Sequence, residues 1–177
     1  CIHADFYTTI PPAAFAGAPI NSFNGLYLTA AKAPVYWNYG SQLTFTNIEM
    51  EGFTDDGALF INCENLSWEE CYTEAFPSNV NTLRFNSCSR VYLKNHITGS
   101  YYHFTAFDSC KQVVIDNYFS GPIKLYGVNT DFVLSNLRIL ASAVRLWLQQ
   151  QANSSISRLQ VDNLFVRDQT DVTDIGQ

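Results

Sequence analysis

The sequence has few charged side chains and no cluster of basic residues. Only 15% of its 177 residues are charged, and the 10 lysines and arginines are scattered along the chain. Nucleic acids and anionic membranes attract proteins through concentrated positive charge, so neither partner is predicted. No run of about 18 apolar residues is present, so we also predict no membrane insertion. The apolar content of 47% is nonetheless enough to form a packed core.

Sequence patterns for metal binding and for common catalytic sites are missing as well. The five cysteines include no C-x-x-C pair and have no histidine partner at a zinc-binding distance. We therefore predict no metal and no cofactor, and we interpret the cysteines as buried free thiols. There is no G-x-S-x-G, no H-E-x-x-H and no phosphate-binding loop. Long amphipathic patterns that would predict helices are also absent.

What the sequence does contain is a repeat. A motif of two large apolar residues alternating with other residues and followed by Asn (h-x-h-x-N) occurs at residues 43–47, 91–95, 113–117, 132–136 and 159–163. With 54 large apolar residues and 15 Asn in the chain, about 1.4 matches are expected by chance, and five are found. A sixth copy, residues 66–70, has Glu70 in the place of Asn. The alternation predicts short strands, and Asn predicts a left-handed turn at the end of each.

A second repeated pattern precedes three of these strands. Phe-x-x-Cys occurs at residues 60–63, 85–88 and 107–110, and each Cys lies seven residues before the turn position of its own repeat. The turn positions from 47 to 163 have a mean spacing of about 23 residues. Coils of this size bury their apolar side only by stacking on one another, at the strand spacing of about 4.8 Å. We expect stacks of Asn, of Cys and of Phe, with the Phe stack continued by Tyr126.

These stacked patterns resemble the right-handed parallel β-helix of pectate lyases and phage tailspikes, whose coils carry an asparagine ladder at a tight turn. The resemblance covers roughly residues 39–167 and implies an all-β fold. Leucine-rich repeats are the alternative for residues 83–91, but a strand, a turn and a strand follow where those repeats have a helix. We expect an irregular segment or first coils over residues 1–40, β-helix repeats over 41–168 and a tail over 169–177. Neither end shows a cap, so we expect an excised piece or ends covered by partner chains.

Candidate catalytic residues come from the outward positions of the predicted strands. Hydrolysis of a glycosidic bond needs two carboxylates at about 5 to 9.5 Å. The candidates are Glu69, Glu74 and Asp108, with a solvated acidic surface as the alternative interpretation. A calcium-dependent lyase is not favoured, because no group of three aspartates accompanies the outward lysines and arginines. His96, which follows a turn Asn, is interpreted as structural.

Candidate carbohydrate-binding residues are Tyr101, Tyr102 and His103, in the most aromatic loop of the repeated region. The resemblance to tailspikes and tail fibres implies a homotrimer, extracellular or on the phage tail of a virion, that binds a bacterial surface polysaccharide with or without cleaving it. The first alternative is a monomeric polysaccharide lyase or hydrolase of the pectate lyase type. The second is a structural or adhesive β-helix, or a leucine-rich-repeat binding module, without enzymatic activity.

Overall fold

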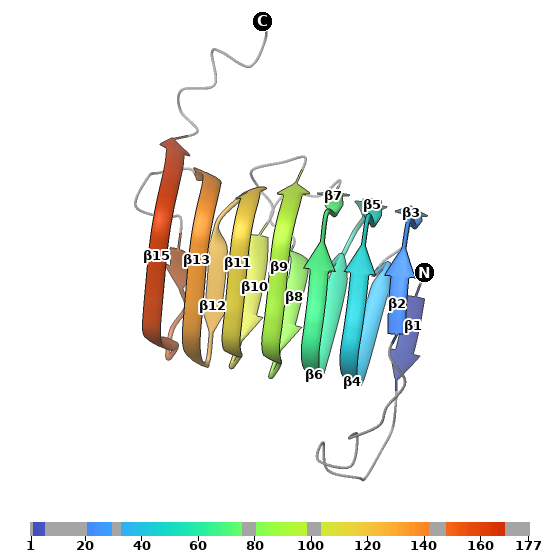
Figure 1. Ribbon diagram of the computed structural model, residues 1–177, viewed down its shortest axis with the longest axis horizontal. Helices are drawn as coiled ribbons and strands as arrows, with labels where there is room; N and C mark the ends of the chain where they lie inside the picture. Colours follow the sequence, from blue (N-terminus) through green and yellow to red (C-terminus); the bar gives the residue numbers. More distant parts are fainter. Residues whose placement is uncertain are drawn as a thin grey trace, which may run out of the picture.

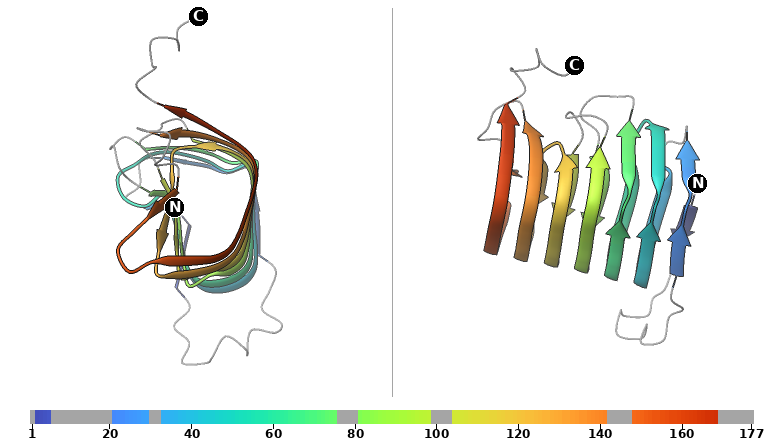
Figure 2. Two further views of the ribbon diagram at one scale, coloured as in Figure 1. Left: turned by 90° about the vertical axis from the view of Figure 1, so that its left-hand side faces the viewer. Right: turned by 45° about the horizontal axis from the view of Figure 1, so that its top comes forward.

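The computed structural model describes residues 2–5, 21–29, 33–75, 81–98, 104–141 and 148–168, and every regular element in these ranges is a β-strand. All strand pairs are parallel, and the chain winds into a β-solenoid with coils of about 23 residues (Figure 1). The predicted all-β parallel β-helix is therefore confirmed. Viewed along the solenoid axis, successive coils superimpose on one closed outline (Figure 2).

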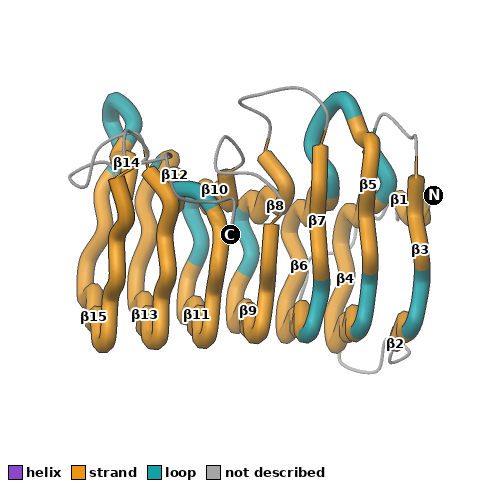
Figure 3. The backbone as a smooth tube through the Cα atoms, turned by 90° about the horizontal axis from the view of Figure 1, so that it is seen from above, coloured by secondary structure: helices purple, strands orange, loops and turns teal. Residues whose placement is uncertain are grey.

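Each coil contributes to three walls. The first wall contains β1 (Ile2–Asp5), the first halves of β4 (Val35–Thr46) and β6 (Ala58–Glu69), β8 (Asn81–Asn86), β10 (Phe104–Asp108), β12 (Ile123–Tyr126) and β14 (Leu148–Gln150). The second contains β2 (Asn21–Asn24), the second halves of β4 and β6, and the first parts of β9 (Ser89–Thr98), β11 (Lys111–Ser120), β13 (Val128–Ala141) and β15 (Ser155–Asp168). The third contains β3 (Tyr27–Thr29), β5 (Glu49–Phe53), β7 (Tyr72–Ala75) and the last parts of β9, β11, β13 and β15 (Figure 3).

The turn between the second and third walls, here called the Asn corner, follows the predicted motif. Its residues all have positive φ, between 50° and 68°, and they are Gly25, Asn47, Glu70, Asn95, Asn117, Asn136 and Asn163. Asn is among the few non-Gly residues that adopt this conformation at low cost. Within each motif the two apolar residues point inward, as Val113 and Ile115 do with no exposed surface. The predicted left-handed turn is confirmed.

A second left-handed corner joins the first and second walls, and the sequence motif does not reveal it. It contains two left-handed residues in most coils. The first of them is Tyr39, Asn62, Ser87, Ser109 or Gly127, with φ between 53° and 61°. The second lies five positions before an Asn corner, with φ between 53° and 60°, and is Gln42, Asn65, Arg90, Gln112, Asp131 or Arg158. Side chains of several of these residues bind across coils: Arg90 donates to Asn65, and Arg158 donates to Asp131. These contacts help to offset the strain of a left-handed turn at residues other than Gly or Asn.

The Phe-x-x-Cys pattern has a direct structural explanation. Cys88 Sγ lies 3.5 Å from the carbonyl oxygen of Phe60 in the preceding coil, and Cys110 Sγ lies 3.4 Å from that of Phe85. Each thiol thus donates a weak hydrogen bond to the coil below it. Both cysteines and Cys63 are buried and free, as predicted. Burial raises the pKa of the Cys88 and Cys110 thiols, so both remain protonated at neutral pH.

The phenylalanine stack lies inside the solenoid. Phe60 and Phe85 are stacked with ring centroids 5.4 Å apart, and Phe85 and Phe107 with centroids 5.0 Å apart. The predicted continuation through Tyr126 is wrong: Leu125 pairs with Phe107, and Tyr126 pairs with Asp108 on the outer side. Phe132 follows Leu125 by seven positions, whereas Val113 follows Phe107 by six, so counting back from the turn at Asn136 places the inward position one residue too late.

Other residues replace cysteine where the cysteine stack ends. Gly40 pairs with Cys63, and a Cβ atom there would collide with the indole of Trp37. In the coil after Cys110, the fully buried Asn129 accepts a hydrogen bond from the Cys110 backbone N–H at 2.9 Å. Asn129 also donates to the carbonyl of Tyr126 at 2.8 Å. This turn is one residue longer than in the preceding coil, and the Asn129 amide satisfies backbone groups that it would otherwise leave unpaired.

The Asn corner supports a first prediction. Asn117 has φ of 50°, and its Nδ2 donates to Asn95 Oδ1 at 2.7 Å. Asn117→Val and Asn117→Gly both lose this bond, but only Val is strained at positive φ. Urea unfolding should therefore show Asn117→Val to be less stable than Asn117→Gly by roughly 1 to 2 kcal/mol. Equal stability of the two variants would contradict a left-handed turn at residue 117.

Candidate functional site

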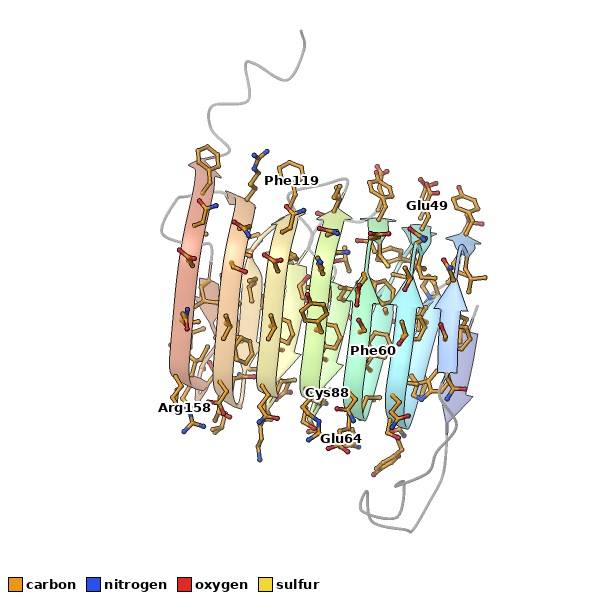
Figure 4. All side chains as sticks on the ribbon, in the orientation of Figure 1. Glu49, Phe60, Glu64, Cys88, Phe119 and Arg158 are labelled. Atoms are coloured by element: carbon orange, nitrogen blue, oxygen red, sulfur yellow. The ribbon has the colours of Figure 1, made fainter. Side chains whose placement is uncertain are left out.

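The most distinctive surface feature is a row of side chains along the third wall, two residues after each Asn corner. We call it the outer stripe, and its members are Tyr27, Glu49, Tyr72, Ile97, Phe119, Arg138 and Phe165. Neighbouring members are direct partners in the parallel register, so the row is continuous from the first coil to the last. In Figure 4, Glu49 and Phe119 lie at one edge of the solenoid, and Glu64 and Arg158 lie at the opposite edge.

The first half of the outer stripe combines tyrosines with glutamates. Tyr27 is 59% exposed, and its hydroxyl donates to Glu51 Oε2 at 2.7 Å. Two coils further on, the Tyr72 hydroxyl donates to Glu74 Oε2 at 2.6 Å. The hydrogen bond to Glu74 is the main cause that raises the pKa of Tyr72 to about 12, and the bond to Glu51 likewise raises the pKa of Tyr27. Both hydroxyls are therefore protonated at neutral pH, and each ring has a fixed partner.

The second half of the stripe is more apolar. Ile97 is 47% exposed, Phe119 39% and Phe165 61%, while the exposed Arg138 lies between the two phenylalanines. Isolated exposed apolar residues are common on protein surfaces, whereas three of them lie here within four successive positions of one row. The guanidinium of Arg138 adds five hydrogen-bond donors between two exposed rings.

A polar row borders the other side of the Asn corner, on the second wall. Its members share one outward register position and are Thr46, Glu69, Lys94, Asp116, Ser135 and Asp162. Asp116 Oδ1 accepts from Asn136 Nδ2 and from Ser135 Oγ, both at 2.8 Å. These two hydrogen bonds, with a smaller contribution from the charge of Lys94, lower the pKa of the Asp116 carboxyl. Asp116 thus takes part in the amide ladder as an ionised acceptor.

The three predicted catalytic carboxylates do not share one wall. Glu69 lies in the polar row and accepts from Ser67, whereas Glu74 lies on the third wall of the same coil and accepts from Tyr72. The Asn corner at Glu70 separates them. Asp108 ends β10 on the first wall, where Ser109 Oγ donates to its Oδ1 at 2.9 Å. The topology therefore groups Glu69 with Glu74 in one coil and leaves Asp108 apart.

The predicted carbohydrate-binding residues Tyr101, Tyr102 and His103 lie outside the described residues.

Sequence reasoning missed the outer stripe, although its residues can be found by counting two positions from each turn residue. A hydroxyl-rich groove on the corners near Cys88 and Cys110 was also missed. It has a volume of about 570 Å³ and is lined by Ser87, Cys88, Ser89, Ser109, Lys111, Val128 and Thr130.

His96 is a structural residue, in agreement with the sequence-based interpretation. It is fully buried, and its Nδ1 accepts from Trp68 Nε1 at 3.3 Å. Because an indole nitrogen only donates, Nδ1 carries no proton, and the protonated Nε2 donates to Thr73 Oγ1 at 3.4 Å. Tyr118 packs on the ring with centroids 5.7 Å apart. Burial lowers the pKa of His96 to about 3, so the side chain is neutral in the folded protein.

Comparison of the chain with protein-family models, with curated proteins and with solved structures finds no match. Within the described ranges, no helix is long and apolar enough to cross a membrane. Nor do the described His, Cys, Asp and Glu side chains include a group that could hold a metal ion. The function is therefore inferred from the geometry of the solenoid surface.

The buried His96 supports a second prediction, on pH dependence. Its pKa is about 3 in the folded protein and about 6.5 in the unfolded chain, so below pH 6.5 only the unfolded chain takes up this proton. Stability should therefore fall as the pH decreases from 6.5 towards 3, with a loss of about 2 kcal/mol between pH 7 and pH 5 from this residue.

The measurement is urea unfolding of the wild-type protein and of His96→Asn at both pH values. Asn keeps an acceptor for Trp68 but does not titrate, so this variant should lack that part of the pH dependence. The same change in unfolding free energy in both proteins would show that His96 is not the source.

Proposed function

We propose that the protein binds a bacterial surface polysaccharide along the outer stripe. The observation that carries the proposal is the continuous register of exposed rings and hydrogen-bonding groups on the third wall. Sugar rings present apolar C–H faces and polar edges, and aromatic side chains pack on such faces while neighbouring polar groups bind the hydroxyls. A straight row with a repeat of about 4.8 Å suits an extended polymer better than a compact ligand.

The two halves of the stripe have different roles in this proposal. Phe119 and Phe165 pack on sugar rings, and Arg138 between them binds a carboxylate or phosphate substituent of the glycan with two parallel hydrogen bonds. In the other half, Glu51 and Glu74 hold the rings of Tyr27 and Tyr72 and accept hydrogen bonds from sugar hydroxyls. A homotrimer and a location on a phage tail, which the resemblance implies, remain predictions.

The test is a bacterial glycan array followed by titration of the best ligand. Phe119→Ala and Phe165→Ala should each weaken binding about ten-fold, equivalent to about 1.4 kcal/mol. Val133→Ala is the matched control, because Val133 is also exposed (37%) but lies on the second wall, and it should bind as the wild type does. Because ring packing carries most of the binding, added salt should weaken it only slightly, by screening the Arg138 contact. No glycan ligand, or equal binding by all three variants, would contradict the proposal.

Cleavage of the bound glycan is a second candidate activity, because Glu69 and Glu74 flank one Asn corner beside the stripe. If they act as a catalytic pair, the wild-type protein should release reducing ends from the glycan it binds. Glu69→Gln and Glu74→Gln should each abolish release. Glu69→Gln should leave glycan binding unchanged, whereas Glu74→Gln should weaken it, because Glu74 also holds the Tyr72 ring. Glu64→Gln is the control, since Glu64 pairs with Arg90 at the opposite corner. Release that persists in both variants would place catalysis elsewhere.

A further inference from the structure

The aromatic rings of the outer stripe occur on every second coil. Aromatic and other residues alternate along the row, which in register order reads Tyr27, Glu49, Tyr72, Ile97, Phe119, Arg138 and Phe165. Four rings can occupy seven positions in about 35 ways, and only one of these keeps all four rings apart. The alternation is therefore a specific arrangement and not a consequence of aromatic content alone.

Neighbouring columns of the same solenoid do not have this pattern. The polar row on the second wall contains no aromatic residue. The next outward column of that wall contains only Tyr92, and its other members are Thr44, Ser67, Val114, Val133 and Gln160. Stacking of the coils does not by itself produce alternate rings, so the outer stripe requires another explanation.

The alternation fixes the distance between successive rings. Parallel strands lie about 4.8 Å apart, so rings on alternate coils are separated by roughly 9.6 Å along the axis. The coils superimpose when the solenoid is viewed along this axis, so the row is straight (Figure 2). Two of the four rings are also held in place, because Tyr27 donates to Glu51 and Tyr72 donates to Glu74. A ligand that contacts all four rings must therefore present an apolar face at each of these intervals.

Polysaccharides with equatorial linkages have this periodicity. In β1→4-linked glucose, mannose or N-acetylglucosamine, the bonds at C1 and C4 are both equatorial, so the chain is nearly straight and successive sugars face opposite ways. One sugar advances such a chain by about the distance that one coil advances the solenoid, roughly 5 Å. Every second sugar therefore presents the same face at the spacing of the rings. Axial linkages, as in α1→4-linked glucose, curve the chain into a helix, which leaves a straight row after a few sugars.

We propose, in an inference that rests on the proposed function, that the glycan bound by the outer stripe is an extended chain of β1→4-linked pyranoses. Every second sugar packs its apolar face on one of the four rings. The sugars between them lie over Glu49, Ile97 and Arg138. Of these, the exposed Glu49 accepts hydrogen bonds from sugar hydroxyls and the exposed Arg138 donates to the glycan. With one sugar on each coil, the described row spans about seven sugars.

The test is calorimetric titration of the full chain with oligomers of the three β1→4-linked sugars, from two to six units long. The steps from two to three units and from four to five each bring one more sugar over a ring, so each should increase the affinity about ten-fold. The steps from three to four units and from five to six add a sugar between rings and should change the affinity only about two-fold. Oligomers of α1→4-linked glucose are the control, and they should bind at least about ten-fold more weakly than the best β1→4-linked oligomer of the same length.

A double variant tests the position of the rings directly. Phe119→Ala removes one ring and should weaken binding of the five-sugar oligomer about ten-fold. Adding Ile97→Phe restores the number of rings but places the new ring one coil away from the alternation. Ile97 is 47% exposed in the same row, so the larger side chain does not disturb the core. The double variant should bind as weakly as Phe119→Ala, and recovery of the wild-type affinity would overturn the proposal.

The outcomes separate this proposal from the proposed function. A glycan of the array that binds through Phe119 and Phe165, together with no binding of any β1→4-linked oligomer, would show that the outer stripe binds another kind of sugar chain. Affinity that increases evenly with every added sugar, or equal binding of the α1→4-linked oligomers, would overturn the proposal in the same way. The absence of any glycan ligand would instead contradict the proposed function, and this proposal with it.

Discussion

The structure depends on one constraint: each coil must turn at the same two left-handed corners, five residues apart, before it stacks on the next coil. The Asn corner and the corner at Gln42, Asn65, Arg90, Gln112, Asp131 and Arg158 maintain this spacing in all six coils where both occur. The short segment between them sets which side chains point inward, and a shift of one residue would move the apolar set to the outside. Length varies instead outside this segment, both beyond the Asn corner and, in the last two coils, in the turn between the first and second walls. Core packing, the thiol contacts and the surface rows all follow from this fixed segment.

The sequence reveals one of the two corners because their chemistry differs. Asn is enriched at positive φ for intrinsic reasons, so five of the seven Asn corners carry a visible motif, while Gly25 and Glu70 do not. At the other corner the residue types are as different as Gln112 and Arg158, so no motif marks the position. Some of these residues make cross-coil contacts, as Arg158 does with Asp131, and such pairs cannot be recognised in the sequence unless the register is known. The wrong assignment of Tyr126 has the same origin, because the extra residue between Leu125 and Phe132 becomes evident only from the register.

The candidate site shows a similar division between what was predictable and what was not. Strand alternation identifies Glu69 and Glu74 as outward residues. It does not reveal that Ser67 and Tyr72 donate hydrogen bonds to them. The outer stripe could have been read by counting two positions from each turn residue. Its significance depends on exposure, because alternation alone does not separate a surface ring from one that packs between coils. Tyr72 illustrates the difference, since it is half-buried while Tyr27 in the same row is largely exposed.

The residues of the outer stripe are not explained by the requirements of the fold. A position two residues beyond the Asn corner accepts Tyr, Glu, Ile, Phe or Arg without a change in backbone, so stacking alone does not select the residue there. Inward columns show the opposite behaviour, because their members are nearly all large and apolar. Exposing Phe119 and Phe165 on a regular, flat wall adds apolar surface that favours association with other molecules. This cost brings no gain to the core, which is the physical reason for proposing a partner on this wall, and the straight row suits an extended molecule.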